Sequence, residues 1–134
     1  MVRKALVTAF CFASALSGCS DKGATAPSAA LIVSLSSPNQ QDGAMAIVLR
    51  GPDLESTQSI KPTTVLYQRL VGTNESHVLI VGDITRGDLL RVEVLGLVAH
   101  PISEYSATVT EVATRTDSSR ASVQGYALTL REEQ

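Results

Sequence analysis

The sequence predicts an all-β domain over residues 30–134, an antiparallel β-sandwich of seven or eight short strands. Apolar and polar residues alternate in short runs, and turn-forming residues separate these runs at intervals of roughly ten residues. Val, Leu, Ile, Thr and Ser dominate, which favours strands, and no segment has a convincing helical period. A small β-barrel is the alternative fold. A doubly wound α/β fold is excluded because crossover helices are lacking.

Two strands and a turn are expected at the start of the domain. Leu31, Val33 and Leu35 alternate with less apolar neighbours and predict a first strand, and Ser37–Gly43 predicts a turn. Residues 44–50 (AMAIVLR) are almost continuously apolar, which predicts a central strand covered on both faces, ended by Gly51-Pro52. Asp53–Lys61 fits either one helical turn capped by Asp53 or a loop between the sheets, and the loop is favoured.

The middle of the domain predicts a hairpin and a strongly alternating strand. Thr63–Val71 and Ser76–Val81 form the hairpin around a turn at residues 72–75. Leu89–Leu95 has the cleanest alternation in the chain. Its expected core-facing residues are Leu90, Val92 and Val94, and its expected solvent-facing residues are Arg91 and Glu93.

The last third predicts a loop, two strands and a turn. Gly96–Glu104 contains Pro101 and reads as a loop, and a turn is expected at Asp117–Ser119. A change of phase at Glu111-Val112 predicts a bulge or a strand end. The inward residues expected in the two strands are Tyr105, Ala107 and Val109 in Tyr105–Thr110, and Tyr126, Leu128 and Leu130 in Val123–Arg131.

Residues 1–18 have the three regions of a secretory signal peptide. Arg3 and Lys4 give a positive start, residues 5–16 are apolar or small, and small residues precede Cys19. The apolar run is shorter than the roughly 20 residues that span a bilayer. We therefore expect this segment to be removed from the mature protein.

The motif Leu16-Ser17-Gly18-Cys19 resembles the lipobox of bacterial lipoproteins, in all four of its positions. The resemblance implies cleavage before Cys19, a diacylglyceryl thioether on its sulfur, and acylation of the new amino terminus. The implied partner is therefore a lipid bilayer in the bacterial cell envelope, and Ser20 in place of an aspartate favours the outer membrane. A plain signal peptide that ends near a cysteine is the alternative. Residues 19–29 then predict a lipidated cysteine and a flexible tether, with an ordered arm as the other possibility.

Composition excludes several classes of function. Cys11 leaves with the signal peptide and Cys19 is lipidated, so the mature domain has no disulfide, thiolate metal site or cysteine nucleophile. Without Arg3 and Lys4 the chain is mildly acidic and has no basic stripe, which excludes nucleic acid as a partner. Trp is absent and both Phe residues lie in the signal peptide, so the domain is poorly supplied with aromatic rings that stack on sugars.

The strand pattern is similar to that of cohesin-like and related carbohydrate-binding-type sandwich domains. The similarity covers Gly43–Pro52 (GAMAIVLRGP), a strand that ends in Gly82-Asp83, and Gly87–Val94 (GDLLRVEV). It implies a β-sandwich. Aromatic residues usual in those domains are missing here, so the resemblance implies no particular ligand residue.

Residues with catalytic or metal-binding chemistry are scattered. His77 and His100 lie far apart, without a third ligand at metal-site spacing, and read as solvated or edge histidines. Asp83 and Asp88 flank a turn with Arg86, which indicates turn residues with a salt bridge more than a calcium site. No Gly-x-Ser-x-Gly motif is present, and Asn74-Glu75-Ser76 reads as a turn. We expect no enzyme activity, no cofactor and no catalytic residue.

Two functions fit these observations, and a small envelope hydrolase is a third with no specific support. The first is a non-catalytic binding module that presents a loop end or a sheet face to a protein or a glycan. The second is a structural or assembly accessory that pairs an edge strand with another chain, with Leu31–Leu35 as the expected edge.

Overall fold

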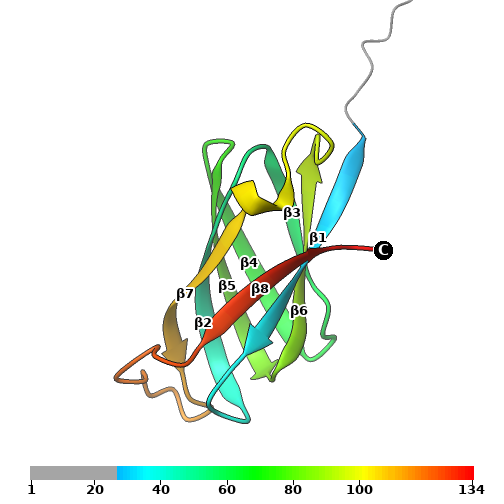
Figure 1. Cartoon of the computed structure of the whole chain (residues 1–134). Helices are drawn as coiled ribbons and strands as arrows, with labels where there is room; N and C mark the ends of the chain where they lie inside the picture. The colour runs from blue at the N-terminus through cyan, green and yellow to red at the C-terminus, as the bar shows by residue number, and fades with distance from the viewer. Residues whose placement is uncertain (1–26) are drawn as a thin grey trace, which may run out of the picture.

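Two four-stranded sheets pack face to face in the computed structural model, which describes residues 27–134 (Figure 1). The predicted signal peptide and lipobox, and all but the last residues of the predicted tether, lie outside the described residues. The strands are β1 (Ser28–Ser36), β2 (Asp42–Arg50), β3 (Leu54–Ser59), β4 (Thr64–Val71), β5 (Glu75–Ile84), β6 (Gly87–Leu95), β7 (Ser106–Ala113) and β8 (Ala127–Glu132), with a 3₁₀ turn, η1 (Ile102–Glu104), before β7.

The strand orders are β3-β6-β1-β8 in one sheet and β4-β5-β2-β7 in the other. Every pairing within the sheets is antiparallel. The sheets are separate and do not close on each other, so the predicted sandwich is confirmed and the alternative barrel is wrong.

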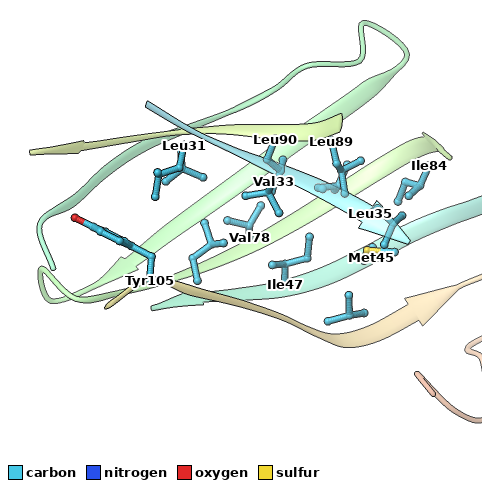
Figure 2. Close-up of a cluster of buried hydrophobic side chains, with 14 of the residues drawn as sticks. Leu31, Val33, Leu35, Met45, Ile47, Val78, Ile84, Leu89, Leu90 and Tyr105 are labelled. Atoms are coloured by element: carbon cyan, nitrogen blue, oxygen red, sulfur yellow. The ribbon is translucent and has the colours of Figure 1, made fainter. Parts of the chain in front are cut away.

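The core lies between the sheets and is built from the side chains that point inward at alternate positions along the strands (Figure 2). Leu90, Val92 and Val94 of β6 are buried, as their alternation predicts, while Arg91 and Glu93 point outward. The predicted inward residues of the last strand, Tyr126, Leu128 and Leu130, pack against the core as partly buried side chains. Burial of apolar side chains here contributes about 25 cal/mol per Å² to folding.

The change of phase predicted near Glu111 is a β-bulge. Ala46 of β2 pairs with Glu111, whereas the next residue, Ile47, pairs with Val109, so Thr110 is the extra residue in β7. The bulge lets Val109 and Val112 both face the core although three positions separate them.

The segment predicted to be a loop after β2 contains a strand. Residues 54–59 form β3, which pairs with β6 at the edge of its sheet. Its sequence, LESTQS, is mostly polar, so it shows little of the alternation between apolar and polar residues that marks a strand. Only Leu54 and Thr57 are buried. Backbone pairing with β6 outweighs the weak local propensity.

Gln68 joins the neighbouring edges of the two sheets. Its amide oxygen accepts a hydrogen bond from the Thr57 backbone N–H at 2.8 Å, and its amide nitrogen donates to the Glu55 carbonyl at 3.0 Å. Its amide nitrogen also reaches the buried Ser76 hydroxyl at 3.0 Å. One side chain of β4 therefore satisfies backbone groups of β3 that no strand pairs with on that side.

Strand β2 ends at Arg50, and Gly51 follows it as predicted, with a φ of +153°. The ring of Tyr105 packs directly on the Gly51 α-carbon, in the place where a side chain would be. A glycine is required at this close approach, and Tyr105 covers the end of the core beside it.

Two predictions for the first strands need correction. Strand β1 lies between β6 and β8, so Leu31–Leu35 is a central segment and not an edge. Asp42 and Gly43, predicted as part of the turn, are the first residues of β2. Strand β8 supplies the second neighbour of β1. It begins 91 residues after the end of β1, so the local sequence pattern of β1 carries no information about this pairing.

Candidate functional site

The outer face of the β4-β5-β2-β7 sheet carries apolar side chains where a solvated face would carry polar ones. Strand β2 is central in this sheet, as predicted, but only one of its faces is covered: Met45, Ile47 and Leu49 are buried, whereas its other face is partly open. We call the outer side chains of Ala44, Ala46, Val48, Val65, Tyr67, Leu79 and Val81 the apolar face.

The register of the strands places these residues in transverse rows. Val65 pairs with Val81, Val81 with Ala44, and Tyr67 with Leu79. Across β4, β5, β2 and β7 the rows read Val65–Val81–Ala44–Ala113, Tyr67–Leu79–Ala46–Glu111, Arg69–His77–Val48–Thr108 and Val71–Glu75–Arg50–Ser106. The first two rows are apolar except for Glu111, which ends the second row, and the third and fourth rows carry the other charged side chains.

The large apolar side chains of the first two rows are open to solvent, whereas Ala44, Ala46 and Ala113 are partly buried. Exposure is 62% for Tyr67, 57% for Val65, 42% for Leu79 and 41% for Val81. Of the three tyrosines in the described residues, only Tyr67 is exposed, since Tyr105 is buried and Tyr126 is partly buried. A shallow groove lined by Ala46, Tyr67 and Leu79 runs across this face. Contiguous apolar residues of this kind mark interaction surfaces.

The outer face of the β3-β6-β1-β8 sheet carries a network of ion pairs. Arg91 of β6 bonds Glu93 at 2.7 Å and Glu133 at 2.9 Å, and Arg131 of β8 bonds Asp88 at 2.6 Å. These side chains cover Ile32, which is 5% exposed although it belongs to the outer face. The two outer faces therefore differ in kind, and only one of them presents open apolar surface.

Three carboxylates on the outer faces have lowered pKa values. A hydrogen bond from Ser34, and then the charge of Arg131, lower the pKa of Asp88. Bonds from Ser56 and Arg91 lower that of Glu93 in the same way. Bonds from His77 and Arg50 lower the pKa of Glu75.

These shifts predict acid sensitivity. The pKa of each of these carboxylates is lower in the folded protein than in the unfolded chain. The unfolded chain therefore binds more protons at pH values between the two pKa values. The contribution of these carboxylates to folding stability is complete above the unfolded pKa and is lost as the pH falls through the folded pKa. We expect the melting temperature to fall as pH is lowered from about 5 to about 3. Thermal unfolding at a series of pH values checks this, with Asp88→Asn expected to flatten the profile. A melting temperature that rises toward pH 3 would contradict it.

The residues with predicted chemistry do not form a common site. His77 bonds Glu75 at 2.7 Å beside the apolar face, whereas His100 bonds Glu104 at 3.0 Å and lies 3.8 Å from Asp53, next to η1. Asp83 pairs with Arg115 and Asp88 with Arg131, so the predicted salt bridge to Arg86 is wrong for both. Arg86 instead donates to the Ser37 carbonyl at 2.7 Å.

Neither a metal cluster nor a spanning helix is found in the described part of the chain. Residues 27–134 hold no group of three or more His, Cys, Asp or Glu side chains placed to bind a metal ion. They also contain no helix that is long and apolar enough to cross a membrane. Cys19, Leu16, Ser17 and Gly18, the predicted lipidation site and cleavage motif, lie outside these residues.

Sequence reasoning missed the apolar face, although a signal for it was present. Residues 78–81 (VLIV) are apolar at successive positions, so both faces of β5 are apolar. In an antiparallel sandwich one face of such a strand meets solvent or a partner. No protein-family model, curated protein or solved structure matches the chain.

Proposed function

We propose that this protein is a lipid-anchored bacterial envelope lipoprotein whose domain is a non-catalytic interaction module. Its binding surface is the apolar face, and its partner is a protein. The observation that carries the proposal is the contrast between the two outer faces. Ion pairs cover the outer face of the β3-β6-β1-β8 sheet, whereas Val65, Tyr67 and Leu79 are open to solvent on the β4-β5-β2-β7 sheet.

The anchor is supported by the lipobox pattern, Leu16-Ser17-Gly18-Cys19. Ser28 lies nine positions after Cys19, so the chain between them reaches at most about 30 Å when extended. The sandwich is thereby held close to the bilayer, and the outer membrane is favoured because Ser20 follows the cysteine. Two or more acyl chains hold a protein stably on a membrane.

A protein partner fits the apolar face better than a glycan does. Glycan recognition relies on aromatic rings, and Tyr67 is the one exposed aromatic residue of the described chain. The rest of the face is aliphatic with charges at its margin, as in the core and rim of protein interfaces.

Edge-strand pairing is the second candidate, now with a different strand. β4 is an edge strand of eight residues, and its sequence TVLYQRLV has high β-propensity. It carries no Pro, and Arg69 is its one charged side chain. An extended segment of another chain could add to β4, whereas β1 has both sides occupied.

Photo-crosslinking in intact cells tests the proposed surface. A photoreactive amino acid replaces Tyr67 in the full-length chain, and a matched variant carries it at Thr129, which is exposed on the other sheet. We expect specific adducts from position 67 and none from position 129. Equal labelling from both positions, or none from either, would overturn the assignment of the surface.

The anchor has a separate test. Cys19→Ser is expected to remove the acyl groups, so that the protein moves from the detergent-rich to the aqueous phase on Triton X-114 partitioning. Intact-mass measurement of the wild-type protein should show the acyl mass on a chain that begins at Cys19. An unmodified wild-type chain would refute lipidation while leaving the surface proposal standing.

A further inference from the structure

We infer that the apolar face binds a second copy of this chain, with the two sheets packed face to face about a two-fold axis parallel to the strands and between β5 and β2. The inference rests on the proposed function, since it names the partner of that same face. Such an axis reverses the strand order of the partner, so β4 lies over the second copy's β7 and β5 over its β2.

The rows of the face are self-complementary under this operation. In the first row, Val65 and Val81 meet Ala113 and Ala44 of the other copy, so large residues face small ones. In the second row, the Tyr67 hydroxyl faces Glu111, which can accept a hydrogen bond from it.

The charges of the face match as well. In the fourth row, Arg50 lies on β2 and Glu75 on β5. The axis places Arg50 of each copy opposite Glu75 of the other copy. These residues already form an ion pair at 2.8 Å within one chain. Opposite charges therefore meet on dimerisation. If the strand order of the second copy were not reversed, Arg50 would face Arg50 and Glu75 would face Glu75.

Two further charges have no partner within the chain. Arg69 is the one Lys or Arg of residues 27–134 that forms neither an ion pair nor a side-chain hydrogen bond there, and Glu111 likewise forms none. Both are exposed, on the strands at opposite edges of the sheet, roughly 14 Å apart by strand spacing. The axis lays β4 of one copy over β7 of the other, with Arg69 one row from Glu111, within reach of an extended arginine.

The size of the face suits a weak dimer. Four strands about 4.8 Å apart and roughly eight residues long present on the order of 500 Å². Two copies would bury about 1,000 Å², which is the lower limit for a specific interface. Confinement of anchored chains to one membrane raises their effective concentration and favours such a contact.

A charge swap tests this geometry. Sedimentation velocity of residues 27–134, which contain all eight strands and the whole described core, should show a monomer–dimer equilibrium. Arg69→Glu and Glu111→Arg should each weaken dimerisation at least tenfold, and the double variant should restore it to within about threefold of the wild type. Because the two positions lie too far apart to touch in one copy, rescue reports a contact between copies.

The control separates contact from net charge. Arg69→Glu with Glu132→Arg has the same net charge as the swap, but Glu132 is an exposed residue of β8 in the other sheet. This variant should stay as weak as Arg69→Glu alone, and circular dichroism should show all variants folded.

Failure of this inference is distinguishable from failure of the proposed function. A monomer at all concentrations, together with position-67 crosslinks to a different protein in cells, would overturn the second copy and leave the interaction surface in place. A monomer without any crosslink would overturn both. A dimer that neither reversal weakens would overturn the packing described here.

Discussion

Replacing Asp42 by alanine is expected to lower the free energy of unfolding by about 1–3 kcal/mol, because the donors that bond its buried carboxylate lose their acceptor. The Asp42 side chain is 1% exposed, and Arg120 bonds it through Nε at 2.6 Å and Nη2 at 2.5 Å. The Tyr126 hydroxyl donates to its second oxygen at 2.8 Å and accepts from the Asn39 amide at 2.7 Å. Removal of the carboxylate leaves the Arg120 charge without its partner.

This network has a structural task, because it fastens the connection between β7 and β8. The connection has no strand or helix of its own over residues 114–126, and Arg120 and Tyr126 tie it to the start of β2. The hydrogen bond to Asp42 also raises the pKa of Arg120. In Figure 1 this connection lies at the end of the sandwich opposite η1.

Chemical denaturation of the two aspartate variants measures the effect. Asp88→Ala is the matched control, because Asp88 also bonds an arginine, at 2.6 Å, but both side chains are about half exposed. Solvent screens an exposed pair, so we expect a clearly smaller loss for Asp88→Ala than for Asp42→Ala. A loss for Asp42→Ala no larger than that for Asp88→Ala would show that burial does not set the strength of this pair.

The second large effect is expected at Ile80. Ile80→Ala should lower the free energy of unfolding by about 2–5 kcal/mol, since Ile80 is 0% exposed and its removal leaves a cavity between the sheets. Leu79→Ala is the control: it lies next along β5, loses a similar number of atoms, and is 42% exposed on the apolar face. We expect about 1 kcal/mol or less for Leu79→Ala.

Urea unfolding at low protein concentration checks both variants without a contribution from association. The pair also separates folding from binding, because Leu79→Ala should weaken the proposed dimer while leaving the domain folded. Equal stability losses for the two variants would contradict the assignment of Leu79 to an open face.

Local pattern was sufficient for the strands that alternate strongly. The alternation of Leu90, Val92 and Val94 predicted both β6 and its buried side, and the change of phase near Glu111 predicted the bulge in β7. These features follow from the period of two along a strand, which any single segment carries by itself. β3 escaped prediction because its residues are mostly polar and its partner, β6, is distant in the sequence.

The sequence by itself determined the class of fold and the inward residues of β6, β7 and β8. It also contains, before the domain, the Leu16-Ser17-Gly18-Cys19 motif that resembles a lipobox. Only the tertiary structure decided which strands are edges, that Asp42 is a buried partner of Arg120, and that Val65, Tyr67, Leu79 and Val81 share one open face. The reason is physical: burial and neighbourhood depend on strands paired across up to a hundred residues. A single strand that is apolar on both sides cannot show which side the opposite sheet covers.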